Sequence, residues 1–199
     1  MATTKKTDAA ITLVPIEQEI LDIEIKGKTP LIVHAWSQKA KQMMLDKQMG
    51  KKAVKELKDP AADYESSIYY LGDGRHGIPA TAVKSATIGG ARFFKGSVTM
   101  AGLKPVIYVH ADDPATGLIA IRGEARPRED MVRVGMGTAD IRYRAEYPDW
   151  SATIRVEFAP HMIDAASVVA LVDAGGRVGI GEWRPEKGGI YGTYSVVAS

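Results

Sequence analysis

Apolar and polar residues alternate along three segments of the chain, which is the pattern of strands that bury one face. These segments are residues 21–25, 140–147 and 152–158. The second segment carries apolar side chains on one face and charged side chains on the other, namely Arg142, Arg144 and Glu146. Because Pro148-Asp149 is a turn signal, we expect the last two segments to pair as an antiparallel hairpin.

Short apolar runs predict further strands. They cover residues 30–34, 106–109 and 118–121, and a last strand is predicted over residues 190–197. The first of these runs follows Gly27-Lys28, which is a turn signal.

Helical spacing of apolar residues predicts three helices between these strands. Ser37 is the candidate N-cap of the first, along which Met43 and Met44 recur at helical spacing. Pro79 stands in the first turn of the second, where its missing N–H is tolerated. The third is expected over residues 162–174 and to end at Gly175-Gly176.

Strands and helices in mixed order, with hairpin signals, predict an α+β fold. Residues 1–10 are polar and are predicted to form a mobile tail, and residues 11–199 to form a single α+β domain.

Composition narrows the class of protein. The chain has 199 residues, of which 45% are hydrophobic and 25% charged, the balance of an ordinary globular domain. It has no cysteine, which excludes disulfides, thiolate metal sites and cysteine nucleophiles. Because no apolar run reaches the ~20 residues of a membrane span and the N-terminus lacks the core of a signal peptide, we expect no membrane partner and a cytoplasmic location.

Residues 175–192 combine seven glycines with Arg, Lys, Trp and Tyr side chains. Glycines let a ligand approach the backbone, cations attract phosphate, and aromatic rings stack on bases. The order is helix, glycines, strand, which excludes a dinucleotide fingerprint, and the spacing does not match a P-loop. A helix C-cap followed by turns is the alternative interpretation, although it does not require Arg184 and Lys187 between the glycines.

Positive charge is local, because the net charge is only +2. Seven lysines lie between residues 38 and 58, and residues 84–104 include Lys84 and Arg92 without an acidic residue. Gly135-Met136-Gly137 predicts a flexible element next to Arg142 and Arg144. Each group is typical either of a phosphate-binding track or of a solvated face, and the sequence leaves both open.

The sequence predicts no catalytic residue, metal site or cofactor. The four histidines are scattered without zinc-site spacing, and a structural role is the simpler interpretation of His34 and His110. No segment has the pattern of a nucleophile elbow.

Three segments together resemble the RAMP superfamily, notably the backbone subunit of CRISPR effectors that lines guide RNA. They are Gly-Lys-Thr-Pro-Leu-Ile-Val-His at residues 27–34, Gly-Ile-Pro-Ala-Thr-Ala-Val-Lys-Ser-Ala at residues 77–86, and the glycine-rich segment before the last strand. The chain also resembles small phage-encoded proteins with this pattern. It is short for the family, and only residues 123–137 are a candidate for the family's thumb insertion.

The resemblance implies a ferredoxin-like or RRM-like antiparallel sheet with helices packed on one face, elaborated by a hairpin. It also implies binding of single-stranded nucleic acid and head-to-tail assembly into a helical filament. The residues that we predict to contact nucleic acid are Lys84, Arg92, Arg142, Arg144, Trp183, Arg184, Lys187, Gly188, Gly189 and Tyr191.

The first functional hypothesis is therefore a non-enzymatic protein of a bacterial host cell's cytoplasm. It coats single-stranded DNA or RNA as a head-to-tail oligomer or filament, in phage recombination or replication. The alternative is a protein-binding factor without nucleic-acid binding of its own, either a viral mimic or inhibitor of a CRISPR effector or a virion assembly component. An RNA endonuclease is a third hypothesis, for which His34 is the histidine nearest to a family motif.

Overall fold

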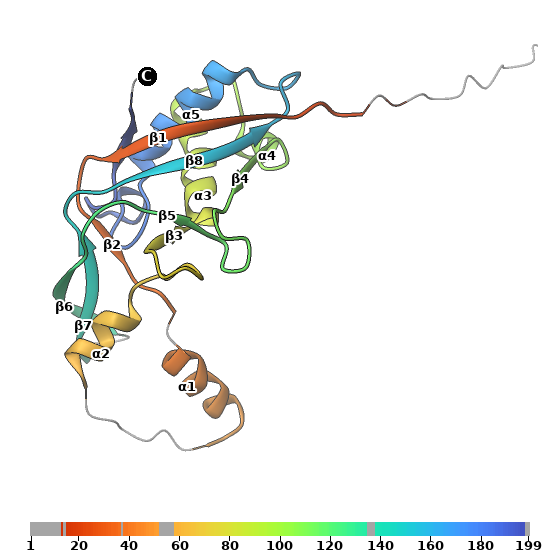
Figure 1. The fold of residues 1–199 in the computed structure, drawn as a ribbon. Helices are drawn as coiled ribbons and strands as arrows, with labels where there is room; N and C mark the ends of the chain where they lie inside the picture. Colours follow the sequence, from red (N-terminus) through yellow and green to blue (C-terminus); the bar gives the residue numbers. More distant parts are fainter. Residues whose placement is uncertain (1–12, 14, 37, 52–57, 135–137, 198–199) are drawn as a thin grey trace, which may run out of the picture.

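A computed structural model describes residues 13, 15–36, 38–51, 58–134 and 138–197 of the chain (Figure 1). The predicted tail at residues 1–10, the candidate cap Ser37 and Gly135-Met136-Gly137 lie outside the described residues.

A four-stranded antiparallel sheet forms the centre of the body (Figure 1). Its strand order is β4-β8-β1-β9, and every neighbouring pair is antiparallel. The strands are β1 (Glu19–Gly27), β4 (Ile107–His110), β8 (Ser151–Phe158) and β9 (Tyr194–Val196).

Two helices, α3 (Ala80–Gly90) and α5 (Ala165–Val178), pack on each other and on one face of this sheet. The chain order of these six elements is β1-α3-β4-β8-α5-β9. That sequence of elements with this strand order is the ferredoxin-like arrangement. The predicted α+β fold, with an antiparallel sheet and helices packed on one face, is confirmed.

Alternation along the strands explains where the core lies. In β8 the alternate residues Ala152, Ile154, Val156 and Phe158 are buried, and the residues between them are more exposed. A strand turns successive side chains to opposite faces, so one face of β8 packs against the helices while the other stays open.

Two insertions build a second layer beside this body. Between β1 and α3 lie β2 (Leu31–Val33), α1 (Gln38–Gln48), α2 (Pro60–Ser66) and β3 (Gly77–Pro79). Between β4 and β8 lie β5 (Leu118–Ala120), β6 (Arg126–Val134) and β7 (Thr138–Tyr147). The short helices are η1 (Ala91–Phe93), α4 (Met100–Leu103) and η2 (Pro185–Lys187).

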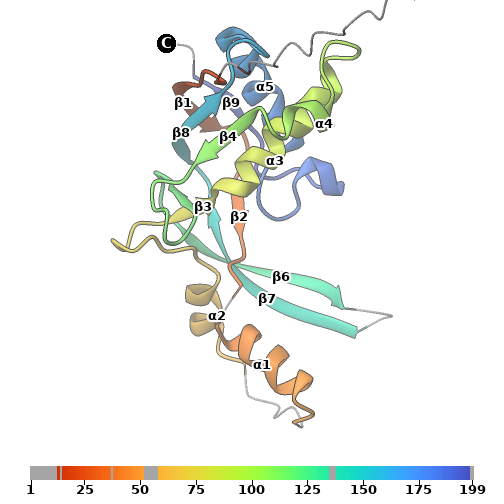
Figure 2. The same cartoon turned by 90° about the vertical axis from the view of Figure 1, so that its right-hand side faces the viewer.

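Strands from the two insertions pair with each other. A three-stranded sheet has the order β2-β7-β6, and β3 pairs with β5. Figure 2 shows β6 and β7 projecting from the body as a hairpin, which we call the β6–β7 arm. This arm is the elaborating hairpin of the α+β fold.

The predicted pairing of residues 140–147 with residues 152–158 is wrong. β7 pairs with β2 and β6, whereas β8 pairs with β1 and β4, so the two strands belong to different sheets. Between them Trp150 is buried, and its indole Nε1 donates to the carbonyl of Thr29 at 3.0 Å. Burial of this large ring fixes the chain where it crosses from one sheet to the other.

The predicted end of the last helix at Gly175-Gly176 is also wrong, because α5 continues to Val178 and Gly179 follows with a φ of 77°. The two glycines serve close packing instead. A Cβ on Gly175 would lie 2.9 Å from the backbone of Ala86 in α3, and one on Gly176 would lie 2.0 Å from the carbonyl oxygen of Tyr194 in β9. The last strand is shorter than the predicted residues 190–197, since only Tyr194–Val196 pair with β1.

Within the described ranges, no helix combines the length and the apolar character that crossing a membrane requires.

Candidate nucleic-acid interface

The β6–β7 arm carries a row of charged side chains on one face. Antiparallel register sets them opposite each other in three cross-strand pairs, Arg126 with Glu146, Arg128 with Arg144, and Asp130 with Arg142. Alternation places these six residues on the same face of the arm.

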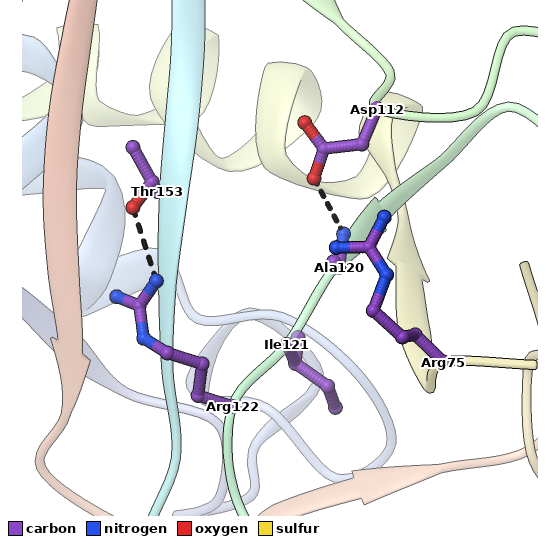
Figure 3. Close-up of a pocket in the computed structure, with 6 residues that line it drawn as sticks. All are labelled: Arg75, Asp112, Ala120, Ile121, Arg122 and Thr153. Carbon is purple, nitrogen blue, oxygen red and sulfur yellow. Dashed lines mark hydrogen bonds between the residues drawn. The ribbon is translucent and has the colours of Figure 1, made fainter. Parts of the chain in front are cut away.

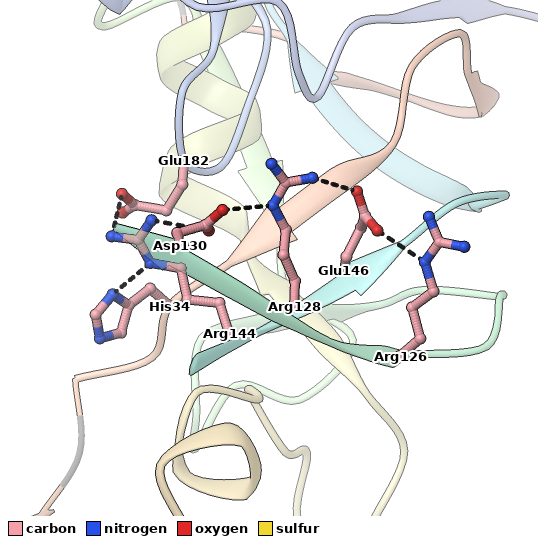
Figure 4. Close-up of polar contacts among 7 residues, drawn as sticks. All are labelled: His34, Arg126, Arg128, Asp130, Arg144, Glu146 and Glu182. Atoms are coloured by element: carbon pink, nitrogen blue, oxygen red, sulfur yellow. Dashed lines mark hydrogen bonds and ion pairs between the residues drawn. The ribbon is translucent and has the colours of Figure 1, made fainter. Parts of the chain in front are cut away.

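The central pair of this row, Arg128 opposite Arg144, is a contact between like charges, which by itself destabilises a sheet. Carboxylates on either side compensate for it. Asp130 accepts from Arg128 at 2.8 Å and from Arg144 at 3.4 Å, and Glu146 accepts from Arg128 at 2.9 Å and from Arg126 at 2.7 Å. Guanidiniums and carboxylates therefore alternate along the row, as Figure 4 shows.

Arg144 lies inside the protein, with its side chain only 2% exposed. The sequence left Arg142 and Arg144 either as a phosphate-binding track or as a solvated face, and the structure encloses Arg144 among its partners. Arg142 is half-buried on the same face, and its nearest carboxylate is Asp140, at 3.8 Å. A buried guanidinium with carboxylate partners organises the site and is not free to bind a phosphate.

Residues 179–193, which we call the C-terminal loop, dock along β2. The N–H of Glu182 donates to the carbonyl of Ile32 at 2.9 Å, and the N–H of Gly192 donates to that of Pro30 at 2.8 Å. These main-chain bonds hold the loop beside the β6–β7 arm, because β2 pairs with β7.

Two aromatic rings of the C-terminal loop lie against the arginines of the arm. The guanidinium carbon of Arg128 is 4.8 Å from the ring centre of Tyr191 and 5.5 Å from that of Trp183, and Arg144 lies 5.2 Å from the Trp183 ring. These distances are typical of cation–π contacts. Trp183 has a φ of 48°, an unusual value for a side chain of this size, and both rings remain half-buried.

The pKa of Arg128 reflects the same enclosure. Burial alone lowers it, but the contacts with Asp130, Tyr191 and Glu146 outweigh burial and raise it above its ordinary value. The guanidinium therefore keeps its charge beneath the two rings.

The glycines of this loop do not form the predicted phosphate cradle of free N–H groups. The N–H of Gly188 donates to the carbonyl of Pro185 at 2.9 Å, and the N–H of Gly189 donates to that of Arg184 at 3.1 Å. Their role is to form a tight turn, since a Cβ on Gly189 would lie 1.7 Å from the carbonyl oxygen of Trp183. Side chains rather than the N–H groups of these two glycines are therefore available for a ligand here.

Further basic residues surround the loop. Glu186 accepts from Arg184 and from Arg92, each at 3.1 Å, which joins η1 to η2, and Lys187 is exposed in the same turn. The pKa of the Glu186 carboxyl lies below its ordinary value, first because of the bond from Arg184 and also because of that from Arg92.

We call this surface the arm–loop face. Its basic residues are Arg92, Arg126, Arg128, Arg144, Arg184 and Lys187; its carboxylates are Asp130, Glu146, Glu182 and Glu186; and its rings are those of Trp183 and Tyr191.

Lys84 is not part of this surface. Its ammonium lies 5.6 Å from the ring centre of Tyr108 in β4, whereas Arg92, eight residues further along the chain, reaches Glu186 in η2. The structure thus brings together most of the predicted residues of the C-terminal loop with Arg92 and Arg144, and directs Lys84 elsewhere.

The sequence prediction missed Arg126, Arg128, Asp130 and Glu146. A signal was present, because Arg-x-Arg-x-Asp at residues 126–130 mirrors Arg-x-Arg-x-Glu at residues 142–146. Pro127 concealed it, since proline argues against a central strand and is tolerated at an edge such as β6.

His34 lies at the inner end of the row and faces a pocket. Its Nδ1 accepts from Nε of Arg144 at 3.2 Å, and Glu182 lies 3.7 Å from the same guanidinium (Figure 4). Because a guanidinium only donates, this bond places the proton of the neutral ring on Nε2. Burial, and secondarily the charge of Arg144, lowers the pKa of His34 below its ordinary value, so the ring stays neutral.

The pocket beside His34 has a volume of about 180 Å³. Apolar walls come from β2, β3, the start of α3 and the C-terminal loop. Polar atoms come from His34, Tyr69, Glu182 and Arg184.

A second, larger hollow of about 420 Å³ lies between β5 and β8 (Figure 3). Arg75 and Arg122 extend over it, and both have carboxylate partners, Asp73 at 2.7 Å and Glu24 at 2.8 Å. Asp112 accepts from the N–H of Ala120 at 2.8 Å. Unlike the arm–loop face, this hollow has no Trp or Tyr ring among the residues that line it.

Among the described residues, His, Asp and Glu side chains form no group of three that suits a metal ion.

No family model matches the chain, and no curated protein does. Solved structures that are similar to it include the cryo-EM structure of the Type III-B Cmr-beta bound to cognate target RNA, with a TM-score of 0.48 and 11% identity over 91% of this chain and 59% of that one. Another is the crystal structure of Cmr6 from Pyrococcus furiosus, with a TM-score of 0.43 and 9% identity over 92% of this chain and 100% of that one. The chain thus spans 59% of the length of the first of these chains. At these values neither similarity carries an argument about function.

Proposed function

We propose that this protein binds single-stranded nucleic acid at its arm–loop face, as a non-enzymatic protein of the RAMP type. The observation that carries the proposal is the pair of half-buried rings, Trp183 and Tyr191, held on the guanidinium of Arg128. Rings at the edge of a basic surface give bases a platform for stacking, and the surrounding cations attract the phosphates.

The charge of the face supports the same ligand. Carboxylates neutralise the enclosed arginines, but Lys187 is exposed, and Arg126 keeps 61% of its side chain exposed while bonding to Glu146. Lys187 follows Trp183 in the C-terminal loop, and Arg126 lies two residues before Arg128 on β6. A strand whose bases stack on the rings would place its phosphates beside them.

The absence of an enzymatic activity is part of the proposal. The histidine that an RNA endonuclease would use here is His34. Its Nδ1 lone pair accepts from Arg144, and its Nε2 carries the proton, so the neutral ring has no lone pair left to remove a proton from a substrate.

Self-association on the bound strand is the finer part of the proposal. Met131 and Ile141 lie opposite each other across the two strands of the arm and are both exposed. Apolar residues on a projecting element are typical of a contact surface, and here they support head-to-tail contact between copies. We place a filament of this kind in phage recombination or replication within a bacterial cell.

Titration of fluorescent oligonucleotides of about 16 nucleotides, in DNA and RNA form, tests nucleic-acid binding. We expect binding at about 50 mM salt that weakens steeply at about 200 mM, because phosphate contacts release counterions. In the double variant Arg126→Ala and Lys187→Ala, the negative slope of log K against log salt should become less steep by about two. The control, Lys26→Ala with Arg155→Ala on the open face of the central sheet, should leave the slope unchanged. An absence of binding by the wild type at low salt would refute the proposal.

Negative-stain microscopy with and without oligonucleotide tests self-association. We expect filaments that depend on the oligonucleotide and that Met131→Ser shortens or abolishes. Met162→Ser is the matched control, because Met162 is 63% exposed against 75% for Met131 and lies outside the arm. Filaments of equal length in both variants would show that the arm takes no part in the contact between copies.

A protein-binding factor is the second candidate function, and α1 favours it. This helix exposes Met43, Met44 and Leu45; Met49 directly after it is also exposed, and Trp36 before it is 65% exposed. Methionine-rich exposed surfaces adapt to protein partners. The test is binding to a purified CRISPR effector complex. Met44→Glu should abolish this binding, and Met162→Glu should not. If the complex binds in this way and no oligonucleotide binds, the second function replaces the first.

A further inference from the structure

The helix α1 exposes apolar side chains that nothing in the described part of the chain covers. Met43, Met44 and Leu45 are all exposed along it. α1 makes at most slight contact with any other helix or strand of the described residues, whereas α3 and α5 pack closely on each other. Figure 1 shows α1 apart from the body that the central sheet and these two helices form.

A helix of this kind needs a partner. α1 has 11 residues, and isolated helices shorter than about 12–15 residues are marginal in water even when they consist of good helix formers. In proteins most helical stability comes from the packing of an apolar face. Because Met43, Met44 and Leu45 find no such packing among the described residues, we expect another surface to cover them.

The charges around α1 indicate what kind of surface covers it. Residues 38–58 contain seven lysines against Asp46 and Glu56, and Lys41 is exposed within the helix. The phosphates of a nucleic acid would attract the lysines but would leave the methionines in water. A protein surface that combines carboxylates with apolar side chains suits both kinds of residue, since methionines adapt to apolar partners.

The chain carries such a surface at residues 15–20, which we call the β1 start. Ile16 and Ile20 are exposed there, and Glu17 and Glu19 are exposed beside them. The carboxylates further along β1 have arginine partners, but among the described residues no cation forms an ion pair with Glu17 or Glu19. The β1 start thus offers apolar side chains together with negative charge that the described residues do not neutralise.

The β1 start and α1 lie at opposite ends of the molecule, as Figures 1 and 2 both show. The two surfaces therefore do not meet within one copy. A contact between them joins two copies through different surfaces, and it repeats from copy to copy because each copy keeps one surface of each kind.

We propose that α1 of one copy packs on the β1 start of a second copy. The methionines of α1 lie against Ile16 and Ile20, and Lys41 lies beside the carboxylates of the β1 start. This contact goes beyond the proposed function, because it joins copies without nucleic acid and without the β6–β7 arm.

Sedimentation equilibrium of the protein without nucleic acid tests the contact. We expect the mean mass of the wild type to rise above that of one chain between about 10 and about 300 µM, because a single short helix gives an interface at the small, weak end of the range. Met44→Glu on α1 and Ile20→Lys on the β1 start should each stay at the mass of one chain. Met162→Glu, at an exposed methionine outside both surfaces, is the control and should associate like the wild type.

A mixture of the two variants tests whether the two surfaces meet each other. Met44→Glu keeps an intact β1 start, and Ile20→Lys keeps an intact α1. An equal mixture should therefore form pairs of chains and nothing larger, although each variant alone stays single. The pairs would also show that both variants fold, because each must supply one intact surface.

Three results would refute the contact. They are a wild type that stays single at every concentration, association that survives in either variant, and a mixture of variants, both folded by circular dichroism, that forms no pairs. None of these results changes the proposed nucleic-acid binding, which the oligonucleotide titration tests separately.

Discussion

The arm–loop face and the open face of the central sheet carry the same kinds of side chain in different surroundings. On the open face Arg155 donates to Asp22 at 2.9 Å, and the two side chains are 57% and 51% exposed. On the arm–loop face Arg144 and Asp130 are 2% and 4% exposed. Both pairs lie on antiparallel strands, so the difference comes from what covers them.

The C-terminal loop provides the cover. Among the described residues nothing comparable lies over Arg155, whose bond lowers the pKa of the Asp22 carboxyl while both groups stay in solvent. Exposed ion pairs of this kind contribute about 0–1 kcal/mol. Under Trp183 and Tyr191 the same chemistry becomes a buried network, in which each charge depends on its partners.

Replacing Arg144 tests this difference most strongly. Arg144→Ala leaves the buried Asp130 with Arg128 as its remaining ion-pair partner, and we expect a loss of about 3 kcal/mol in the free energy of unfolding. Arg155→Ala should leave the free energy of unfolding close to that of the wild type, because both partners of its ion pair are exposed. Urea denaturation of both variants measures the two losses, and similar values would show that the cover does not matter.

Displacing the loop should give the next largest effect. A Cβ on Gly189 collides with the carbonyl of Trp183, so Gly189→Ala should cost about 1–3 kcal/mol and change the Trp183 fluorescence, which is isolated from that of Trp36 and Trp150 by subtracting the spectrum of Trp183→Phe. Gly188, whose φ is 80°, has open space around it. Gly188→Ala therefore tests the strain of its backbone alone and should leave the Trp183 signal in place. If the Trp183 signal changes equally in the two variants, close packing is not what holds the ring.

Removing a ring should weaken binding as well as uncover the ion pairs beneath it. We expect Trp183→Ala to weaken binding of single-stranded oligonucleotides about tenfold, since a base stacked on an aromatic ring contributes about 1–3 kcal/mol. Tyr108 on β4 is also exposed, at 54%, but lies on the open face. Tyr108→Ala should bind like the wild type in the same anisotropy titration. A larger loss from Tyr108→Ala would move the binding surface to the open face.

A pH series gives the smallest and most specific effect. His34 has a folded pKa below its ordinary 6.5, so the unfolded chain takes up a proton that the folded protein does not. The resulting stability is fully present above 6.5 and is lost as the pH falls towards the folded pKa. In His34→Asn the amide oxygen replaces Nδ1 as acceptor without titrating. From about pH 7.5 to about pH 5.5 the wild type should lose more stability than this variant, and parallel curves would contradict the assignment.

Local patterns predicted most of the elements. Alternation located β1, β7 and β8, apolar runs located β2, β4 and β5, and Pro79 marked the start of α3. The predicted hairpin was wrong because β7 and β8 are neighbours in the chain but belong to different sheets. Gly175-Gly176 has the composition of a helix end, and only the contacts with Ala86 and Tyr194 explain why the helix continues through it.

By itself, the sequence determined the α+β class, the strand faces and the C-terminal loop as the segment of interest, because these depend on the period of apolar residues and on local glycine and charge content. It did not determine which arginines are enclosed. Arg142 and Arg144 are equivalent in an alternating strand, and only the docking of the C-terminal loop buries one beneath Trp183 and leaves the other half-buried. Tertiary packing decides that distinction, because burial depends on residues that are distant in sequence. Once buried, the ion pairs form a network that orders the site.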